Sequence, residues 1–420
     1  MRRAVLVICD GLRADMLDPV STPHLAALAG RALSFARHRG VFPSVTRVTS
    51  ASIATGSHPG RHGLQGNVMA IDEGGGLVAL SVGDVDFRAR LRRATGRTLH
   101  VPTLAERLAG HGGAIVMSNV SPGAAHFQDP DGHGWVYHRS GSARPGGAAV
   151  AADDELRVSH DAAGDTAMTE RFCNDVLGAR RPTLAVLWLC EPDHTGHGSP
   201  LGSPEYMTAL AAADRCVGRV AATVAALPDA AETLLLVGSD HGHETVARAI
   251  RVDERLVAAG LKAAIDSRDV VVADNGSAAL IHLADAARPR LDAILAFLER
   301  EDWVGEIHAG AALRAIGQND ATSLAVAVSL RKSAAANGYG IRGTTDRVLA
   351  SGSTKERIGW GDHGGLGEYE QRPFLMAHGA GIPAGAVRHG ATSVTDIAPT
   401  ILAHLGLPAA GMDGRTLDLG

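Results

Sequence analysis

Three uninterrupted apolar runs mark the chain, at residues 4–9, 184–190 and 234–237. Each run is bounded by polar or charged positions and is shorter than an ordinary core helix. Continuous apolar runs of this length are typical of strands that are buried on both faces of a parallel sheet. We therefore expect these three segments to be central strands.

Segments with apolar residues at helical spacing lie between these runs. The pattern predicts helices at 23–29, 46–55, 103–108, 166–177, 204–227 and 395–405, and shorter strands at 34–39, 114–117 and 374–377. Strands that alternate with helices predict an α/β fold with a doubly wound, mostly parallel sheet. Residues 57–66 are expected to be loop, and residues 67–99 and 120–165 to be irregular surface excursions.

The pattern changes between residues 250 and 350. The segments 270–272, 279–283, 291–298 and 324–330 are expected to form short strands and helices. This mixture predicts a smaller α+β cap inserted into the main domain. The expected division is a catalytic core at 1–249 and 351–420, with a cap at 250–350.

Composition narrows the class of protein. The 420 residues are 45% hydrophobic and carry a net charge of −5, so nothing indicates a nucleic acid polymer or a membrane as partner. The four cysteines form no CxxC pattern, which predicts free, buried thiols and a cytoplasmic location. The first apolar run is too short for a signal peptide. The sequence does not decide whether the protein forms a homo-oligomer.

One hydroxyl is placed for chemistry. Thr46 follows Phe42-Pro43-Ser44-Val45 and begins the helix that we expect to end at Gly56. A hydroxyl at a helix start is usually only a cap. Thr46 becomes a candidate nucleophile because stretches rich in Asp, His and Gly occur at the ends of the predicted strands.

Candidate metal ligands follow each central strand. Asp10 ends the first run, Asp193 and His197 follow the second at helical spacing, and Asp240 and His241 follow the third; His363 lies in a later glycine-rich turn. Carboxylate and imidazole ligands together favour Zn²⁺, with Mn²⁺ or Fe as competitors. Six such side chains are too many for one zinc ion and suit two. A hydroxyl bound to one ion would have a lowered pKa, which is the activation that Thr46 needs.

Other histidines lack this paired spacing. His58, His62, His133 and His243 lie in predicted loops, so we expect them to be solvated or to support the ligands. His243 is the best supporting candidate because it is two residues from His241.

These motifs resemble those of the alkaline phosphatase superfamily. The matching stretches are Asp10-Gly11-Leu12-Arg13, Phe42-Pro43-Ser44-Val45-Thr46, Pro192-Asp193-His194-Thr195-Gly196-His197, Ser239-Asp240-His241-Gly242 and His363-Gly364-Gly365. Within the superfamily the chain is most similar to the nucleotide pyrophosphatase/phosphodiesterase branch, with phosphonoacetate hydrolase a close relative. The resemblance covers residues 4–66, 184–245 and 355–415.

The resemblance implies a role for each matching residue. Asp193, His197 and His363 would hold one metal ion; Asp10, Asp240 and His241, with the Thr46 oxygen, would hold the other. Thr46 would attack phosphorus and form a phospho-threonine intermediate. The implied function is a di-metal phosphodiesterase or pyrophosphatase-type hydrolase that acts on a small-molecule phosphoester.

Departures from the pattern define the alternatives. The resemblance implies an Asn that contacts phosphate three residues after the nucleophile, where this chain has Thr49. Sulfatases carry an Arg four residues after theirs, where this chain has Ser50, and the related mutases use a Ser nucleophile. A phosphonate hydrolase is the nearest alternative, with Arg47, Arg61 or Lys355 as candidate carboxylate contacts. A metal-binding scaffold without turnover is the alternative from another class.

Overall fold

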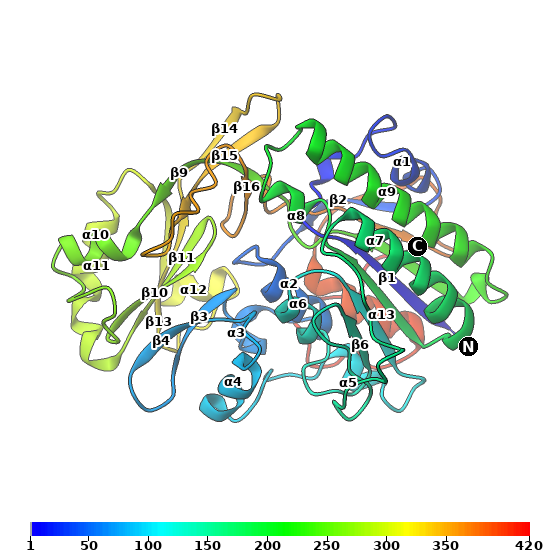
Figure 1. The fold of residues 1–420 in the computed structure, drawn as a ribbon, viewed down its shortest axis with the longest axis horizontal. Coiled ribbons are helices and arrows are strands. Elements are labelled where there is room, and N and C mark those ends of the chain that lie inside the picture. Colours follow the sequence, from blue (N-terminus) through cyan, green and yellow to red (C-terminus); the bar gives the residue numbers. More distant parts are fainter. Residues whose placement is uncertain (1) are drawn as a thin grey trace.

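An eight-stranded sheet forms the centre of the computed structural model, which describes residues 2–420 (Figure 1). In spatial order the strands are β18 (Val387–Ser393), β2 (Leu33–Arg39), β17 (Leu375–His378), β8 (Thr233–Gly238), β1 (Arg3–Cys9), β7 (Leu184–Leu189), β5 (Ala114–Ser118) and β6 (Trp135–His138). Only β17 runs antiparallel to its neighbours. The predicted α/β fold with a mostly parallel sheet is confirmed.

Helices cover both faces of this sheet. Val5 and Val7 of β1 point into one core, and Leu6 and Ile8 point into the other, as the two-residue period of a strand requires. The first core is covered by α1 (Pro23–Ala29), α7 (Ala162–Arg171), the π-helix η2 (Phe172–Arg180) and α9 (Pro204–Ala225). The second is covered by α2 (Thr46–Thr55), α5 (Leu104–Leu108), α6 (Pro122–Phe127) and α13 (Ile397–Leu405). Figure 1 shows α7 and α9 lying side by side along the sheet.

A smaller sheet lies beside the central one (Figure 1). It is antiparallel, with the spatial order β10 (Val270–Asn275), β11 (Ala278–Leu283), β13 (Leu324–Leu330) and β12 (Val304–Ala309). It packs with α10 (Val252–Ala258) and α11 (Leu291–Leu298) around a core of its own, and α12 (Ala311–Ala315) lies beside it. The short strands and helices expected between 270 and 330 are present: the segments at 270–272, 279–283 and 324–330 are strands and the segment at 291–298 is a helix.

A third sheet connects this insert to the central one. It contains β14 (Lys332–Ala336), β15 (Arg342–Val348), β9 (Glu244–Ile250) and β16 (Gly361–Asp362). Strand β15 pairs with β9, so the chain on both sides of the expected boundaries belongs to one sheet. The division at 249/250 and 350/351 stays a prediction.

Three segments differ from expectation. Residues 57–66 contain the short helix α3 (Pro59–His62); residues 67–99 form a hairpin of β3 (Val68–Asp72) and β4 (Leu77–Ser81) followed by α4 (Phe87–Thr95); and residues 120–165 contain α6 and the edge strand β6. The loop and irregular predictions were wrong at these elements, whereas the rest of 57–66 and most of 128–161 are turn and loop as expected. These elements are too short to show a period, and they gain their order from packing, as Met69 and Leu80 do against Phe127.

Two expectations from composition can be compared with the structure. The four cysteines are buried and free, as predicted. Among the helices of the described chain, none combines the length and the apolar character needed to cross a membrane.

Candidate active site

Three neighbouring strands deliver the acidic residues to one edge of the sheet. Strand β1 lies between β7 and β8 and is parallel to both, so their carboxyl ends meet. Asp10 directly follows β1, Asp193 begins the short helix α8 (Asp193–Gly196) beyond β7, and Asp240 follows β8. Ligands of open α/β sheets bind at this edge. Residues separated by up to 230 positions thus converge because of the strand order.

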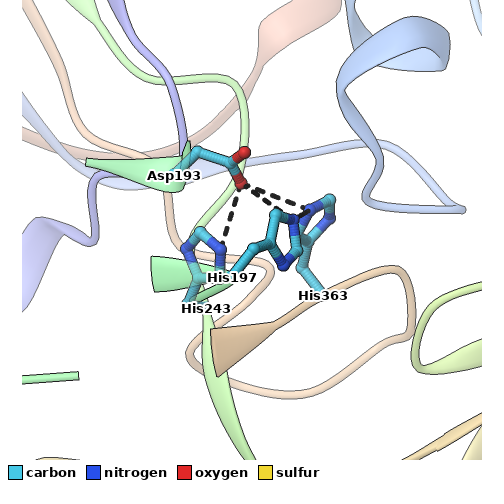
Figure 2. Close-up of side chains that lie close together, drawn as sticks. All are labelled: Asp193, His197, His243 and His363. Atoms are coloured by element: carbon cyan, nitrogen blue, oxygen red, sulfur yellow. Dashed lines mark hydrogen bonds and ion pairs between the residues drawn. The ribbon is translucent and has the colours of Figure 1, made fainter. Parts of the chain in front are cut away.

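Four side chains near this edge form a group that we call the Asp193 cluster: Asp193, His197, His243 and His363 (Figure 2). Oδ1 of Asp193 lies 3.4 Å from Nε2 of His197 and 3.4 Å from Nε2 of His363. Nε2 of His243 is 3.1 Å from the same oxygen. All four atoms lie within 4.8 Å of one another, a spacing at which one metal ion can bind them together.

The ring orientations of this cluster suit a cation. The Nδ1 atoms of His197, His243 and His363 face the carbonyl oxygens of Gly361, Gly11 and Ser44, at 3.1, 3.1 and 2.7 Å. A carbonyl only accepts hydrogen bonds, so Nδ1 of His243 and Nδ1 of His363 carry the proton and Nε2 of each neutral ring presents a lone pair. Nδ1 of His197 also lies 2.6 Å from Nη1 of Arg357, which is a donor, so the contacts of Nδ1 do not fix the tautomer of this ring. Nε2 of His197 and Nε2 of His363 are only 3.1 Å apart, which is close enough for both to bind one cation.

A second group, the Asp10 cluster, contains Asp10, Asp240 and His241. Nε2 of His241 lies 3.1 Å from Oδ2 of Asp240 and 3.5 Å from Oδ1 of Asp10. Oγ1 of Thr46 is 3.1 Å from the same Nε2. Oδ2 of Asp240 is buried and has no hydrogen-bond donor within the described residues. These residues also fit a divalent cation, with the Thr46 hydroxyl beside it.

The two clusters adjoin and concentrate negative charge. The rings of His241 and His363 stack with centroids 3.7 Å apart, one from each cluster. Burial and the neighbouring carboxylates raise the pKa of Asp10 well above its ordinary value, and burial raises the pKa of Asp240 to about 7. Burial also opposes the protonation of His363, but Asp193 outweighs it and raises the pKa of His363 to about 9. The negative charge that raises the pKa of His363 would also favour a bound cation.

Local structure holds these ligands in position. On α7, the buried Asp165 accepts hydrogen bonds from the backbone N–H groups of Cys190 and Glu191, at 3.1 and 3.0 Å, where β7 ends. Glu191 then accepts from the backbone N–H and the hydroxyl of Thr195 on α8. The turn that carries Asp193 and His197 on one helical face is therefore tied to the sheet from both sides.

A cavity of about 560 Å³ opens onto both clusters. Asp10, Thr46, Asp193, His197 and His363 line its wall. Asp240 and His241 lie fully buried behind them. The structure therefore brings together Thr46 and all six predicted ligands.

Thr49 is placed differently. It lies on α2, is fully buried and does not line the cavity, and its hydroxyl has no hydrogen-bond partner in the described chain. Asn67, just before β3, lines the cavity instead. Its Oδ1 accepts the backbone N–H of Arg47 at 3.1 Å, which leaves its NH₂ group as a donor.

Sequence reasoning singled out His243 as a supporting residue and missed three other residues near the site, for different reasons. Asn67 opens a segment that was expected to be irregular. Trp188 donates from Nε1 to Oδ2 of Asp10 at 2.9 Å but resembles any core residue of a strand. Arg357 is in a loop, and its side chain lines the cavity with Nη1 2.6 Å from Nδ1 of His197.

Comparisons with known proteins agree with this architecture. The profile of the type I phosphodiesterase / nucleotide pyrophosphatase family matches residues 4–325. Two solved structures of murine ectonucleotide pyrophosphatase/phosphodiesterase 5 are similar, each at 19% identity and covering 99% of this chain and 98% of the other. Their TM-scores are 0.69, for an inactive threonine-to-alanine variant in complex with AMP, and 0.68. No curated protein matches. At 19% identity the two solved structures show only that the fold is shared. The family profile matches most of this chain and therefore shows the family. The chain therefore belongs to the type I phosphodiesterase/nucleotide pyrophosphatase family of metal-dependent phosphoric ester hydrolases, within the alkaline phosphatase superfamily.

Proposed function

We propose that this protein hydrolyses small-molecule phosphodiesters or pyrophosphates with Thr46 as its nucleophile. The position of the Thr46 hydroxyl carries the proposal. It stands at the first residue of α2, faces the cavity, and lies 3.1 Å from Nε2 of His241 and 3.5 Å from Oδ1 of Asp10. An alcohol between an imidazole and a carboxylate in a phosphoric ester hydrolase is placed to lose its proton and attack phosphorus.

The reaction would take place in two steps. The Thr46 oxygen would bond to phosphorus as the bond to one leaving oxygen breaks, so that the other substituent stays on the phosphoryl group linked to Thr46. Water would then attack the same phosphorus, release a phosphate monoester and return the hydroxyl of Thr46. Cations bound by the two clusters would lower the pKa of the hydroxyl and offset the charge on the phosphoryl oxygens. The NH₂ group of Asn67 is placed to donate to a phosphoryl oxygen, in the role that Thr49 was expected to have.

Zinc is the metal that these ligands favour. The two clusters offer imidazole nitrogens and carboxylate oxygens only, and each histidine is oriented by a backbone carbonyl. Borderline cations prefer this mixture, whereas Mg²⁺ prefers oxygen alone. Mn²⁺ and Fe remain the competitors.

A second candidate, phosphonate hydrolysis of the phosphonoacetate type, is favoured by Arg357. When Nε2 of His197 is a ligand, its Nδ1 carries a proton and accepts nothing from Nη1 of Arg357. Oδ1 of Asp362 lies 3.8 Å from Nη1 of this guanidinium, which is beyond hydrogen-bond distance. Arg357 is thus available to a second anionic group on the substrate, such as a carboxylate.

The other candidate cations are engaged elsewhere or lie away from the cavity. The guanidinium of Arg47 donates to Ser121 and to the Asn67 carbonyl, and Arg61 pairs with Asp413. Lys355 does not line the cavity. The lining residues also include no Phe, Tyr or Trp, which favours substrates without a stacked nucleobase.

The test compares Thr46→Ala with Thr46→Ser after loading with Zn²⁺ or Mn²⁺. The substrates are bis(p-nitrophenyl) phosphate, p-nitrophenyl phosphate and phosphonoacetate. We expect a diester preference, a loss of about a thousand-fold or more in kcat for Thr46→Ala, and partial activity for Thr46→Ser. Metal content should be unchanged in both variants because the carboxylates and imidazoles remain.

Other outcomes separate the alternatives. Phosphonoacetate cleavage without diester cleavage would support the phosphonate candidate, and metal binding without any turnover would support a scaffold. Activity that survives in Thr46→Ala would show that the nucleophile is another group. Mass spectrometry of acid-quenched protein should find the p-nitrophenyl phosphoryl group on Thr46 during turnover of the diester, and phosphate there during turnover of p-nitrophenyl phosphate.

We also propose a cytoplasmic location, since the four buried, unpaired thiols suit a reducing compartment. The oligomeric state is open to measurement by light scattering.

A further inference from the structure

His243 is a buried histidine for which the proposed reaction has no role. It lies in the turn between β8 and β9 and is fully buried. Its Nδ1 donates to the carbonyl oxygen of Gly11, 3.1 Å away. Its Nε2 makes no hydrogen bond of good geometry in the part of the chain that the structure describes, and the polar atom that faces it is Oδ1 of Asp193. A buried nitrogen that makes no hydrogen bond is costly and requires an explanation.

The position of Nε2 of His243 supplies this explanation. Nε2 of His243 lies 3.1 Å from Oδ1 of Asp193, the oxygen on which His197 and His363 also converge (Figure 2). Ligand atoms on a tetrahedral zinc ion are about 3.3 Å apart, given metal–ligand bonds of about 2 Å. The measured separations of 3.1 to 3.4 Å agree with that spacing.

We propose that His243 is a fourth protein ligand of the metal at the Asp193 cluster, binding through Nε2. The inference rests on the metal dependence assumed in the proposed function. The ligand set would then be one carboxylate and three imidazoles. Because His243 does not line the cavity, it approaches the cluster from the protein interior. The cavity side remains for substrate.

The surrounding backbone leaves space for this ring. A Cβ on Gly11, whose φ is +66°, would lie 2.4 Å from Cε1 of His243. A Cβ on Gly361 would lie 2.9 Å from its Cδ2. Glycines on both sides therefore allow the imidazole to pack between Asp10 and Asp362 and hold it in one orientation.

A supporting role fits the contacts less well. To donate from Nε2 to Asp193, a neutral His243 would have to direct the lone pair of Nδ1 at the carbonyl oxygen of Gly11. Two acceptors would then face each other at 3.1 Å. A ligand role satisfies both nitrogens, Nδ1 as donor and Nε2 as lone pair.

The ligand sets predict two unequal sites. Three imidazoles make the Asp193 cluster selective for Zn²⁺ over Mn²⁺, because nitrogen ligands discriminate against Mn²⁺. The Asp10 cluster, with one imidazole, two carboxylates and a hydroxyl, should discriminate less. A chelator is therefore expected to empty the Asp10 cluster first.

The deciding measurement is the number of imidazoles on zinc, from X-ray absorption. It is made in an Asp240→Asn background, which removes a ligand of the other cluster, with one equivalent of Zn²⁺. We expect three imidazoles, and two when His243→Asn is added. Asn can still donate to Gly11 but offers no imidazole. His282→Asn is the matched control, a buried histidine in the insert whose Nδ1 contacts Ser323, and it should leave the count at three.

The affinity for Zn²⁺ is measured together with the number of imidazoles on zinc. His243→Asn should weaken Zn²⁺ binding at least about tenfold in chelator competition, while His282→Asn should not change it. If the Asp240→Asn protein, with His243 in place, shows only two imidazoles on zinc, the proposal is overturned whatever the affinity. This result does not depend on whether a His243 variant folds. Three imidazoles with no ester hydrolysis would sustain the proposal and reject the proposed function. A chain that binds no Zn²⁺ would overturn both.

Discussion

Asp10 accepts a hydrogen bond from a side chain inside the sheet. Nε1 of Trp188, in the middle of β7, donates to its Oδ2 at 2.9 Å, in register because Trp188 pairs with Ile8. The same hydrogen bond lowers the pKa of Asp10 against burial and neighbouring carboxylates, which raise it. Trp188 therefore orients a candidate ligand without touching the cavity.

Trp188→Phe tests this residue. The ring still fills the core, but the buried carboxylate loses its donor, which favours protonation and frees the side chain to rotate. We expect Zn²⁺ affinity at the Asp10 cluster to fall about 10- to 100-fold. Chelator competition measures it. An unchanged affinity would mean that the hydrogen bond does not orient Asp10.

At the scale of elements, α7 holds the end of β7 through one residue. Asp165 accepts from two backbone N–H groups there and from the side-chain amide of Asn119 at 3.0 Å. Burial raises the pKa of Asp165 to about 6, and these donors lower it. The turn toward Asp193 thus depends on a buried acid one element away.

Asp165→Ala leaves these buried donors without an acceptor. We expect the free energy of unfolding to fall by about 3 kcal/mol or more, at roughly 1 kcal/mol or more per donor. Asp161→Ala at the start of the same helix is the control. Asp161 is an exposed cap that accepts from the backbone N–H of Gly164 and the hydroxyl of Ser159, so its loss should cost about 1 kcal/mol. Urea unfolding measures both; equal losses would contradict the anchoring role.

At the scale of the whole molecule, buried histidines couple stability to pH. Burial lowers the pKa of His38, His62 and His282 to about 3, from an ordinary value near 6.5. Between these values the unfolded chain binds a proton at each site and the folded chain does not. The stability that these groups contribute is therefore complete above pH 6.5 and is lost as the pH falls.

His282→Asn isolates one of these contributions. Well below pH 6.5 each buried histidine contributes a slope of about 1.4 kcal/mol per pH unit to the free energy of unfolding. We expect the variant to lose stability less steeply than the wild type by that amount. Urea titrations at pH 7.5, 5.5 and 4.5 give the slopes, and identical slopes would be inconsistent with a neutral, buried His282.

Metal removal should also act on the whole molecule. Both clusters bury carboxylates at one edge of the sheet, so cations that bind only the folded chain stabilise it by about 4 kcal/mol for each site when free metal exceeds Kd a thousand-fold. We expect Tm to fall by several degrees on chelation and to recover with Zn²⁺. Calorimetry with elemental analysis measures both. A constant Tm after confirmed metal loss would refute the coupling.

The sequence alone determined the strongest local features. The runs at 4–9, 184–190 and 234–237 indicated buried strands, because their short length and continuous apolar character are local properties of the sequence. Pro23 and Gly30 marked the start and the end of a helix, because each acts on the backbone within a few residues. The residue types after the strands also indicated two metal sites and a hydroxyl beside them. The hairpin at 68–81 and strand β6 were not predicted because they are stabilised mainly by distant partners.

Tertiary structure alone decided which side chains meet. His241 and His243 are the same residue type two positions apart, yet one joins the Asp10 cluster and the other faces Asp193. The same holds for the expected phosphate contact. Thr49, which was expected there, is buried within α2, whereas Asn67 lines the cavity. Strand order and register set these distances across hundreds of residues, and no local pattern of apolar and polar positions encodes them.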